Sequence, residues 1–323
     1  MEVHCEGCAG CCLDWRPLLE DAPRTNDATR GRRRTPFDTD ARAPLDDDTS
    51  FVPLTREEVR SFLEDGMAAA LTPRFWRARD ADEGVEIDGR SVAAVAGRPV
   101  FFVGLRKPPK PVAPFGREET TWLPACVFLD PTTLQCRIHG DERFPDECGA
   151  YPAYNLALEQ ETECQRVESA FGGERLLEAE VDADLDGLLL GSQALGAKLF
   201  VHPDPERLEG IVDRSAAGEL TAADRAECLG VAAGSSPGTL AISESHYEWG
   251  KARALETARD DDRDTGERET GDRGRDESWV GPAIREWQRR YRDANGTVPP
   301  ADVAGYVEVD RGAPETPGWD ALE

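Results

Sequence analysis

The sequence predicts an α+β fold, in which a small cysteine-rich core with short β-hairpins precedes a mainly helical C-terminal part. The first observation is the position of the cysteines, eight of which lie at 5–12 and 126–164. The second is a set of short β-like segments, joined by turn residues, before residue 140. The third is a helical spacing of apolar side chains from residue 174 onward. A chain of 323 residues is long enough to bury a sizeable core.

Residues 1–170 are predicted to form one cysteine-cluster domain. Within it, residues 13–50 are rich in Arg, Asp, Pro and Thr without an apolar period, which indicates a solvated loop insertion. Thr55, with Glu58 three residues later, has the pattern of a capping box and predicts the start of a helix.

Several β features are expected between residues 85 and 138. The segment 85–92, with Asp88-Gly89 at its centre, predicts a hairpin. The apolar run 100–105 predicts a buried strand, and the proline-rich segment 107–111 predicts a stiff extended connector. A second small hairpin is expected over 126–138, because turn residues separate its two short β-like pieces.

Residues 171–259 are predicted to be a helical region. Leucines between 176 and 199 supply one apolar helix face. Pro205 and Thr221 mark the starts of short helices, and residues 243–259 predict a further helix.

The C-terminal residues divide into a charged linker at 260–278 and an amphipathic helix with a tail at 279–323. The linker is almost entirely Asp, Glu, Arg, Thr and Gly, which cannot form a packed core. The helix is indicated by Val280, Ile284, Trp287 and Tyr291, which recur at intervals of 4, 3 and 4. We expect this helix to dock on its own chain, with a protein partner as the alternative.

The acidic composition of the chain indicates the kind of solvent it works in more than the kind of partner it binds. Lys and Arg number 38 against 64 Asp and Glu, so the formal net charge is −26. Such a field repels phosphate groups and anionic lipid, which argues against binding of nucleic acid or a membrane surface. Only four of the basic residues are Lys. This composition indicates the salt-rich cytoplasm of a halophilic archaeon, where multimolar salt shortens the Debye length to about 3 Å.

A cytoplasmic location is also expected from the absence of membrane and export signals. The sequence has no stretch of 18 apolar residues, and its first residues lack the basic start and apolar core of a secretory signal. In a reducing compartment, clustered cysteines are more often metal ligands or catalytic groups than disulfides.

The first cysteine group has the spacing of a metal-binding loop. Cys5, Cys8, Cys11 and Cys12 form the pattern C-x2-C-x2-C-C, and the glycines between them let the backbone turn around one ion. Because adjacent side chains tend to point apart, Cys11 and Cys12 are expected to serve two different metals.

The second group delivers its thiols from separate elements. Successive cysteines are separated by 9, 11 and 15 residues, at Cys126, Cys136, Cys148 and Cys164. Eight thiolates cannot all surround one tetrahedral ion, so two four-sulfur sites, one multi-metal cluster, or one site with unligated redox thiols all remain open. Sulfur ligands select zinc, copper(I) or iron–sulfur centres rather than magnesium or calcium. The predicted core is therefore centred on a metal, with zinc or iron, including an iron–sulfur cluster, as the candidates.

These motifs resemble the YkgJ-type cysteine-cluster family, whose members are described as zinc- or iron-chelating. The C-x2-C-x2-C-C start matches, as do several later segments: 126–129, 136–139, 144–148, 151–152 and the final cysteine. Phe144 and Gly149 replace arginines that the family commonly has, so no anion-binding role is carried over. The resemblance covers 5–12 and about 126–164. It implies that eight cysteines are metal ligands: Cys5, Cys8, Cys11, Cys12, Cys126, Cys136, Cys148 and Cys164.

Other side chains of interest have simpler expectations. Cys228 is expected to be a buried helix residue. His4 is expected to be exposed, His139 to pack beside the ligands rather than bind metal, and Tyr151 to pack over the site. Four arginines could offset thiolate charge: Arg16, Arg137, Arg143 and Arg166.

A non-enzymatic metal-binding protein, in which metal binding and folding are linked, is the favoured function. The alternative is an iron–sulfur or metal-dependent enzyme, either redox or protein-modifying, since the family resembles the cysteine-rich segment of flagellin lysine methylases. The sequence has no glycine-rich nucleotide loop, G-x-S-x-G or H-E-x-x-H motif. A catalytic zinc site would also keep only three protein ligands. Chain length and the missing signal argue against a secreted disulfide scaffold.

Overall fold

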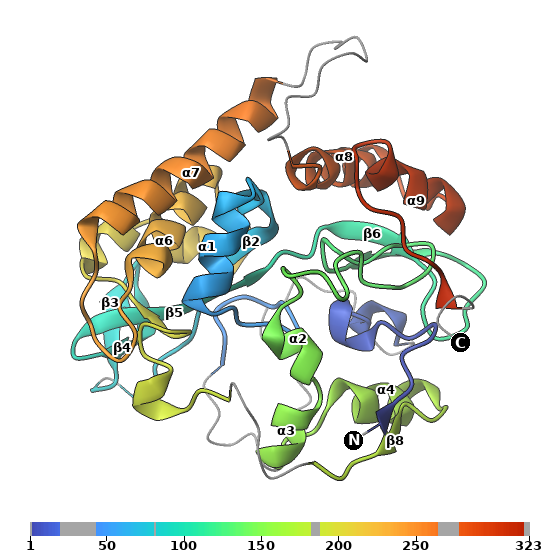
Figure 1. The fold of residues 1–323 in the computed structure, drawn as a ribbon, viewed down its shortest axis with the longest axis horizontal. Coiled ribbons are helices and arrows are strands. Elements are labelled where there is room, and N and C mark those ends of the chain that lie inside the picture. Colours follow the sequence, from blue (N-terminus) through green and yellow to red (C-terminus); the bar gives the residue numbers. More distant parts are fainter. Residues whose placement is uncertain (1, 20–42, 81, 182–187, 264–277, 320–323) are drawn as a thin grey trace. The chain divides into compact units, whose positions relative to one another are not determined.

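The computed structural model describes residues 2–19, 43–80, 82–181, 188–263 and 278–319. The chain forms two compact units, each assembled from separate segments. The cysteine unit comprises 1–22, 105–188 and 278–323, and the sheet unit comprises 23–104 and 189–277. Helices and antiparallel sheets are both present, and helices fill most of the C-terminal half, so the predicted α+β class is confirmed (Figure 1).

The unit boundaries differ from the contiguous ranges expected from the sequence, because long-range pairing joins distant segments. In the sheet unit, strand β5 (Arg98–Leu105) pairs with β9 (Phe200–Val201). In the cysteine unit, strand β6 (Pro109–Val112) packs against helices α8 (Val280–Asp293) and α9 (Ala301–Val309).

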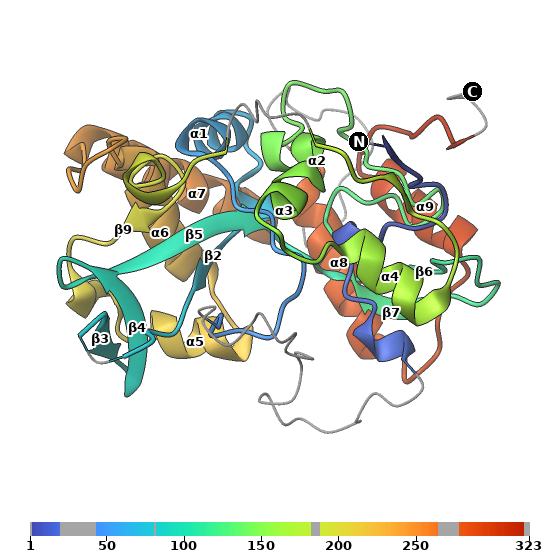
Figure 2. The same cartoon turned by 90° about the horizontal axis from the view of Figure 1, so that it is seen from below.

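The sheet unit contains a five-stranded sheet in the order β2-β5-β4-β3, with β9 also paired to β5. Its other strands are β2 (Leu71–Phe75), β3 (Gly84–Ile87) and β4 (Arg90–Val95). The predicted hairpin is β3–β4, turning at Asp88 and Gly89, which both have positive φ. The predicted buried strand lies within β5, which Figure 2 shows as a long ribbon beside β4.

Among the residues of the sheet unit that the structure describes, the α-helices are α1 (Arg56–Glu64), α5 (Ile211–Ala217), α6 (Ala222–Gly234) and α7 (Glu244–Arg263). The capping box at Thr55 is confirmed, and Thr221 caps α6 in the same way. Pro205 begins a short 3-10 helix, as expected. Helices α1, α6 and α7 lie side by side (Figure 1).

Three sequence expectations in these segments need correction. The helical face predicted over 176–199 is wrong, since this stretch holds strand β8 (Leu176–Glu178) and a 3-10 helix (Gly191–Gln193); Leu185 lies outside the described residues. Helix α7 continues to Arg263, into the predicted linker, whose residues 264–277 are likewise outside the described part. The predicted loop insertion is wrong at its edges, because Leu13 and Leu45 are buried, while residues 20–42 are not described.

The cysteine unit combines two small two-stranded sheets with short helices. Strand β1 (Glu2–Val3) pairs with β8, and β6 pairs with β7 (Thr121–Pro124), both antiparallel. The proline-rich connector is therefore extended, as predicted, but part of it forms the paired strand β6. The helices are α2 (Asp146–Ala150), α3 (Ala153–Ala157), α4 (Glu163–Phe171), α8 and α9.

The amphipathic C-terminal helix is confirmed as α8, and it docks on its own chain. Trp287 is fully buried and packs against Ala304 and Val307 of α9 and against Trp122 of β7. The rings of Trp287 and Trp122 meet edge to face, with centroids 6.2 Å apart. Within the described residues, no helix is both long and apolar enough to cross a membrane.

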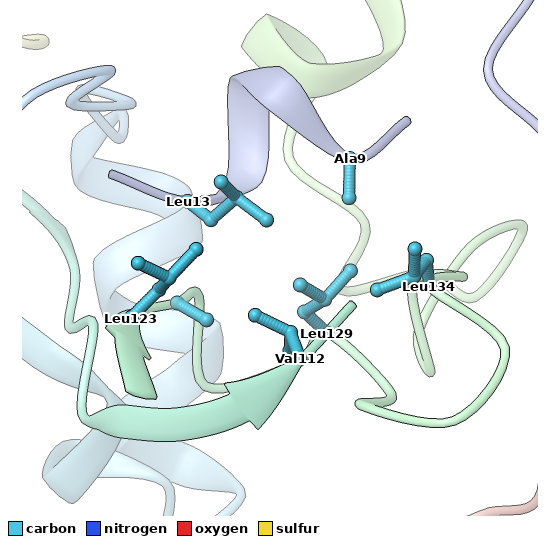
Figure 3. Close-up of a cluster of buried hydrophobic side chains, with 7 residues drawn as sticks. Ala9, Leu13, Val112, Leu123, Leu129 and Leu134 are labelled. Atoms are coloured by element: carbon cyan, nitrogen blue, oxygen red, sulfur yellow. The ribbon is translucent and has the colours of Figure 1, made fainter. Parts of the chain in front are cut away.

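One hydrophobic core of the cysteine unit is shared by the N-terminal loop and the segment 112–134 (Figure 3). Ala9 and Leu13 reach it from the N-terminal loop, and Leu123, Leu129 and other apolar side chains from the segment 112–134. Cys12 and Cys126 pack against this core. Burial of these side chains removes apolar surface from water, and this holds the N-terminal loop against the later segment.

Candidate functional site

The N-terminal cysteines lie on a tight loop that ends in a 3-10 helix. The amide of Cys8 donates to the carbonyl of Cys5 at 3.0 Å, and Gly10–Cys12 forms the 3-10 turn. Gly7 has φ +63°, a conformation that favours glycine. The C-x2-C-x2-C-C segment is therefore a tight turn.

Backbone hydrogen bonds join this loop to the second cysteine group. The amide of Cys126 donates to the carbonyl of Cys12 at 2.6 Å, and the amide of Asp14 donates to the carbonyl of Pro124 at 2.8 Å. Between them, Leu13 and Ala125 form an antiparallel bridge. These bonds fix Cys12 and Cys126 side by side, although they are far apart in sequence.

The sulfurs of Cys11 and Cys12 lie 3.8 Å apart and form a hydrogen bond. The expectation that these neighbours point apart is therefore wrong, because the 3-10 turn directs both side chains to the same region. With a Zn–S distance of about 2.3 Å, two ligands of one tetrahedral zinc are about 3.8 Å apart. This pair already has the separation of two ligands of one ion.

Cys136 lies on the predicted small hairpin, which is confirmed as a single antiparallel bridge between Leu129 and Cys136. Two backbone hydrogen bonds flank the bridge, from Asp130 to Gln135 and from Arg137 to Phe128, both at 2.8 Å. The turn places Cys126 and Cys136 on the two arms of one short loop.

Cys148 and Cys164 come from helices. Cys148 lies on α2, and Cys164 is the second residue of α4, which begins with a capping box at Thr162. Helix α4 packs closely on the 3-10 turn, because a β-carbon built on Gly10 would be 2.7 Å from Val167. Gly10 therefore permits the approach of the Cys164 helix to the N-terminal loop.

Burial dominates the acid–base properties of these thiols. It raises the pKa of Cys5 to about 11 and those of Cys136 and Cys164 to about 12, and it also raises the pKa of Cys8 and Cys126. The hydrogen bond between Cys11 and Cys12 lowers the pKa of Cys11 and raises that of Cys12. In the absence of a metal, most of these groups are therefore thiols near neutral pH.

Electrostatic interactions among the thiols define two neighbourhoods. Cys164 interacts with Cys5, Cys8 and Cys11. Cys12 interacts with Cys126 and Cys148 as well as with Cys11, and Cys136 interacts with Cys126 and Cys11. Cys11 acts on the pKa of thiols in both neighbourhoods. All eight predicted ligands are thus in the cysteine unit, whereas Cys228 is fully buried in α6 of the sheet unit, as expected.

Three cations that lower the pKa of these thiols are not among those selected from the sequence. Each of the four chosen arginines is engaged with carboxylates: Arg16 with Asp14, Arg137 with Asp130 and Glu308, Arg143 with Asp141, and Arg166 with Glu161 and Glu163. Instead, the charges of Lys107 and Lys110 act on Cys126, and that of Arg175 acts on Cys5 and Cys8. The sequence does contain a sign of this role, because two of its four lysines, Lys107 and Lys110, lie in the proline-rich segment before Cys126.

The remaining candidates follow their simpler expectations. His4 is exposed, 3.6 Å from Glu6, and His139 packs edge-on against Phe144. Tyr151 is partly buried near Cys164, and its hydroxyl accepts a hydrogen bond from the amide of Glu163.

In the part of the chain that the structure describes, no group of three or more His, Cys, Asp or Glu side chains has an arrangement that could hold a metal ion. The described cysteines are also free of disulfides. The Cys11–Cys12 pair has ligand spacing, but a third donor would need to move closer to join it.

A model described as a family of unknown function, DUF7531, matches residues 1–320. The chain belongs to this family. The match covers residues of both compact units and includes both cysteine groups. No curated protein and no solved structure matches the chain.

Proposed function

We propose that this DUF7531 protein is a metal-binding protein that holds zinc or an iron–sulfur centre through the cysteines of the cysteine unit. The observation that carries the proposal is the backbone hydrogen bond between Cys12 and Cys126, which lies beside the Cys11–Cys12 sulfur pair. This bond places cysteines of the first and second groups next to each other. Soft thiolates are the donors that zinc and iron–sulfur clusters prefer. The resemblance of the cysteine motifs to the YkgJ-type family supports the same chemistry.

Metal binding in this proposal requires local rearrangement. The sulfurs must come closer together and lose their protons, because the described donors do not form a complete ligand set and burial favours the thiol. This coupling is expected, because a metal binds the deprotonated thiolates and its binding therefore releases protons.

The test is metal analysis of the full chain purified without oxygen in high salt. We expect a stoichiometric transition metal, with zinc in a colourless protein or iron and sulfide in a brown one. The Cys126→Ser variant should lose this metal, whereas Cys228→Ala, outside the cysteine unit, should retain it. A folded full chain that takes up neither zinc nor iron, with all its thiols titrating freely, overturns the proposal.

A further inference from the structure

A network of buried charges lies directly behind the hairpin that carries Cys126 and Cys136. Its members are Lys110 of β6, Glu308 of α9, and Asp130 and Arg137 of the hairpin. The side chains of Lys110, Arg137 and Glu308 are 0% exposed. Fully buried charged groups are rare unless they are paired, and each of these groups lies against an opposite charge.

Glu308 is the centre of the network. Its Oε1 accepts a hydrogen bond from Nε1 of Trp287 at 2.9 Å and lies 2.5 Å from Nζ of Lys110. Its Oε2 accepts from Nε of Arg137 at 2.7 Å. One carboxylate on the C-terminal helix is therefore bound by two cations from the segment 110–137.

Both cations also hold the hairpin itself. Nζ of Lys110 donates to the carbonyls of Val127 and Leu129 at 2.8 and 2.7 Å, on the arm that begins with Cys126. Arg137 follows Cys136 on the other arm, and its guanidinium lies 3.0 Å from Asp130. The network thus fixes the backbone immediately beside each of the two cysteines.

The chain after α9 adds direct contacts to the same hairpin. Arg137 donates to the carbonyl of Pro314 at 2.6 Å, and the indole of Trp319 donates to the carbonyl of Thr133 at 2.7 Å. The amide of Gly318 donates to the side chain of Gln135 at 2.9 Å. The C-terminal segment therefore contacts both the hairpin turn and the buried charges beside it.

We propose that Glu308 is a positioning residue for Cys126 and Cys136, and that the C-terminal segment 278–319 acts through it to hold these two thiols in place for metal binding. The expected effect on metal retention rests on the proposed function. The positioning of the two thiols by Glu308 does not depend on a metal. Lys110, Arg137, Asp130 and Glu308 form two positive and two negative groups, so loss of Glu308 leaves an uncompensated buried positive charge that the hairpin must move to solvate.

The test is peptide-resolved alkylation of cysteines in the metal-free full chain at high salt, comparing wild type with Glu308→Gln and Arg137→Lys. Arg137→Lys keeps the charge but cannot reproduce the forked donor geometry of arginine. The matched control is Glu286→Gln, because Glu286 of α8 binds Arg289, Arg290 and Arg311 but no hairpin residue. Cys8, buried in the same unit, reports on folding of the unit.

We expect both hairpin variants to accelerate alkylation of Cys126 and Cys136 at least tenfold relative to Cys8, with no such change in Glu286→Gln. In the metal-loaded protein, the same variants should release metal faster. Uniform acceleration of all cysteines in both variants, or unchanged rates at Cys126 and Cys136, overturns the positioning role. A wild-type chain that binds no metal would refute the proposed function, while the alkylation result would still decide the positioning of the hairpin.

Discussion

The backbone amide of Cys126 lies 2.6 Å from the carbonyl oxygen of Cys12, and this hydrogen bond joins the two halves of the cysteine constellation. The segments that it joins also share one hydrophobic core, to which Leu13 and Leu129 contribute (Figure 3). Apolar burial and backbone pairing therefore hold the two cysteine groups side by side. In the proposed function, the metal–sulfur bonds would add to these contacts.

Substitution of Cys11 or of Cys12 by serine should cause the same loss of metal. Their sulfurs lie 3.8 Å apart, so both are expected to serve the same ion or cluster. The measurement is the metal-to-protein ratio of each variant, with Cys228→Ala as the control. If one substitution removed half of the metal and the other removed a different half, two separate sites would be indicated instead.

Removal of metal should destabilise the cysteine unit more than the sheet unit. Metal-binding free energy contributes to folding when the ligands come from distant segments. Thermal unfolding in high salt, followed by tryptophan fluorescence, should show a lower midpoint after chelation, and zinc or iron should restore it. Hydrogen exchange in α6 and α7 of the sheet unit serves as the internal control and should not change. Equal loss of protection in both units would contradict this prediction.

Gly10→Ala should weaken the packing of α4 on the cysteine loop. The new methyl group would meet Val167 at 2.7 Å, which is closer than carbon atoms approach, and overpacking of this kind costs about 1–3 kcal/mol. The measurement is the free energy of unfolding in denaturant. The double variant Gly10→Ala/Val167→Ala should recover part of the loss, and Gly149→Ala, whose nearest neighbour would be at 3.6 Å, should have little effect. Additive effects of the two changes would refute the proposed steric contact.

Trp287→Ala should destabilise the chain by about 3–5 kcal/mol, because it removes a fully buried aromatic side chain and leaves a cavity between α8, α9 and β7. Loss of the hydrogen bond to Glu308 adds to this effect. The control is Tyr306→Ala on α9, whose side chain is 68% exposed and whose loss should cost at most about 0.5 kcal/mol. Denaturant unfolding of both variants measures the difference, and similar costs would show that α8 is only loosely docked.

Glu227→Gln should reduce both the stability of the sheet unit and its pH dependence. The carboxylate of Glu227 is bound by Tyr247, Lys251 and His202, and these hydrogen bonds lower its pKa to about 2 against the opposing effect of burial. Because the pKa is lower in the folded state, the stabilisation is complete above the unfolded value of about 4.3 and is lost as pH falls toward 2. Loss of a hydrogen bond to a charged group costs about 1.5–3 kcal/mol.

The check on this prediction is the free energy of unfolding of both proteins between pH 7 and pH 3, at constant salt. The difference between wild type and variant should be largest at neutral pH and should shrink on acidification. A difference that stayed constant over this range would show that the Glu227 carboxylate contributes no pH-dependent stability.

Local sequence patterns predicted the elements whose determinants are local. The Thr55 capping box, the Asp88-Gly89 hairpin and the amphipathic helix α8 all appear as expected, because a few neighbouring residues satisfy their hydrogen bonds or define their apolar face. The leucines at 176–199 misled the prediction, since their spacing also suits short strands and turns. At the start of this stretch, β1 supplies the antiparallel partner that makes Leu176–Glu178 a strand.

The sequence by itself determined which residues make up the candidate site, namely eight cysteines with their spacing. Their sulfur atoms are donors that prefer soft metals. Only the tertiary structure decided which thiols are neighbours, because that depends on the shared core, on the Cys12–Cys126 hydrogen bond and on the 3-10 turn that brings the Cys11 and Cys12 sulfurs together. It also decided that Glu308, which no cysteine motif includes, stands behind the hairpin. Buried ion pairs between distant segments have no local pattern, since their partners are chosen by the packing of the complete fold.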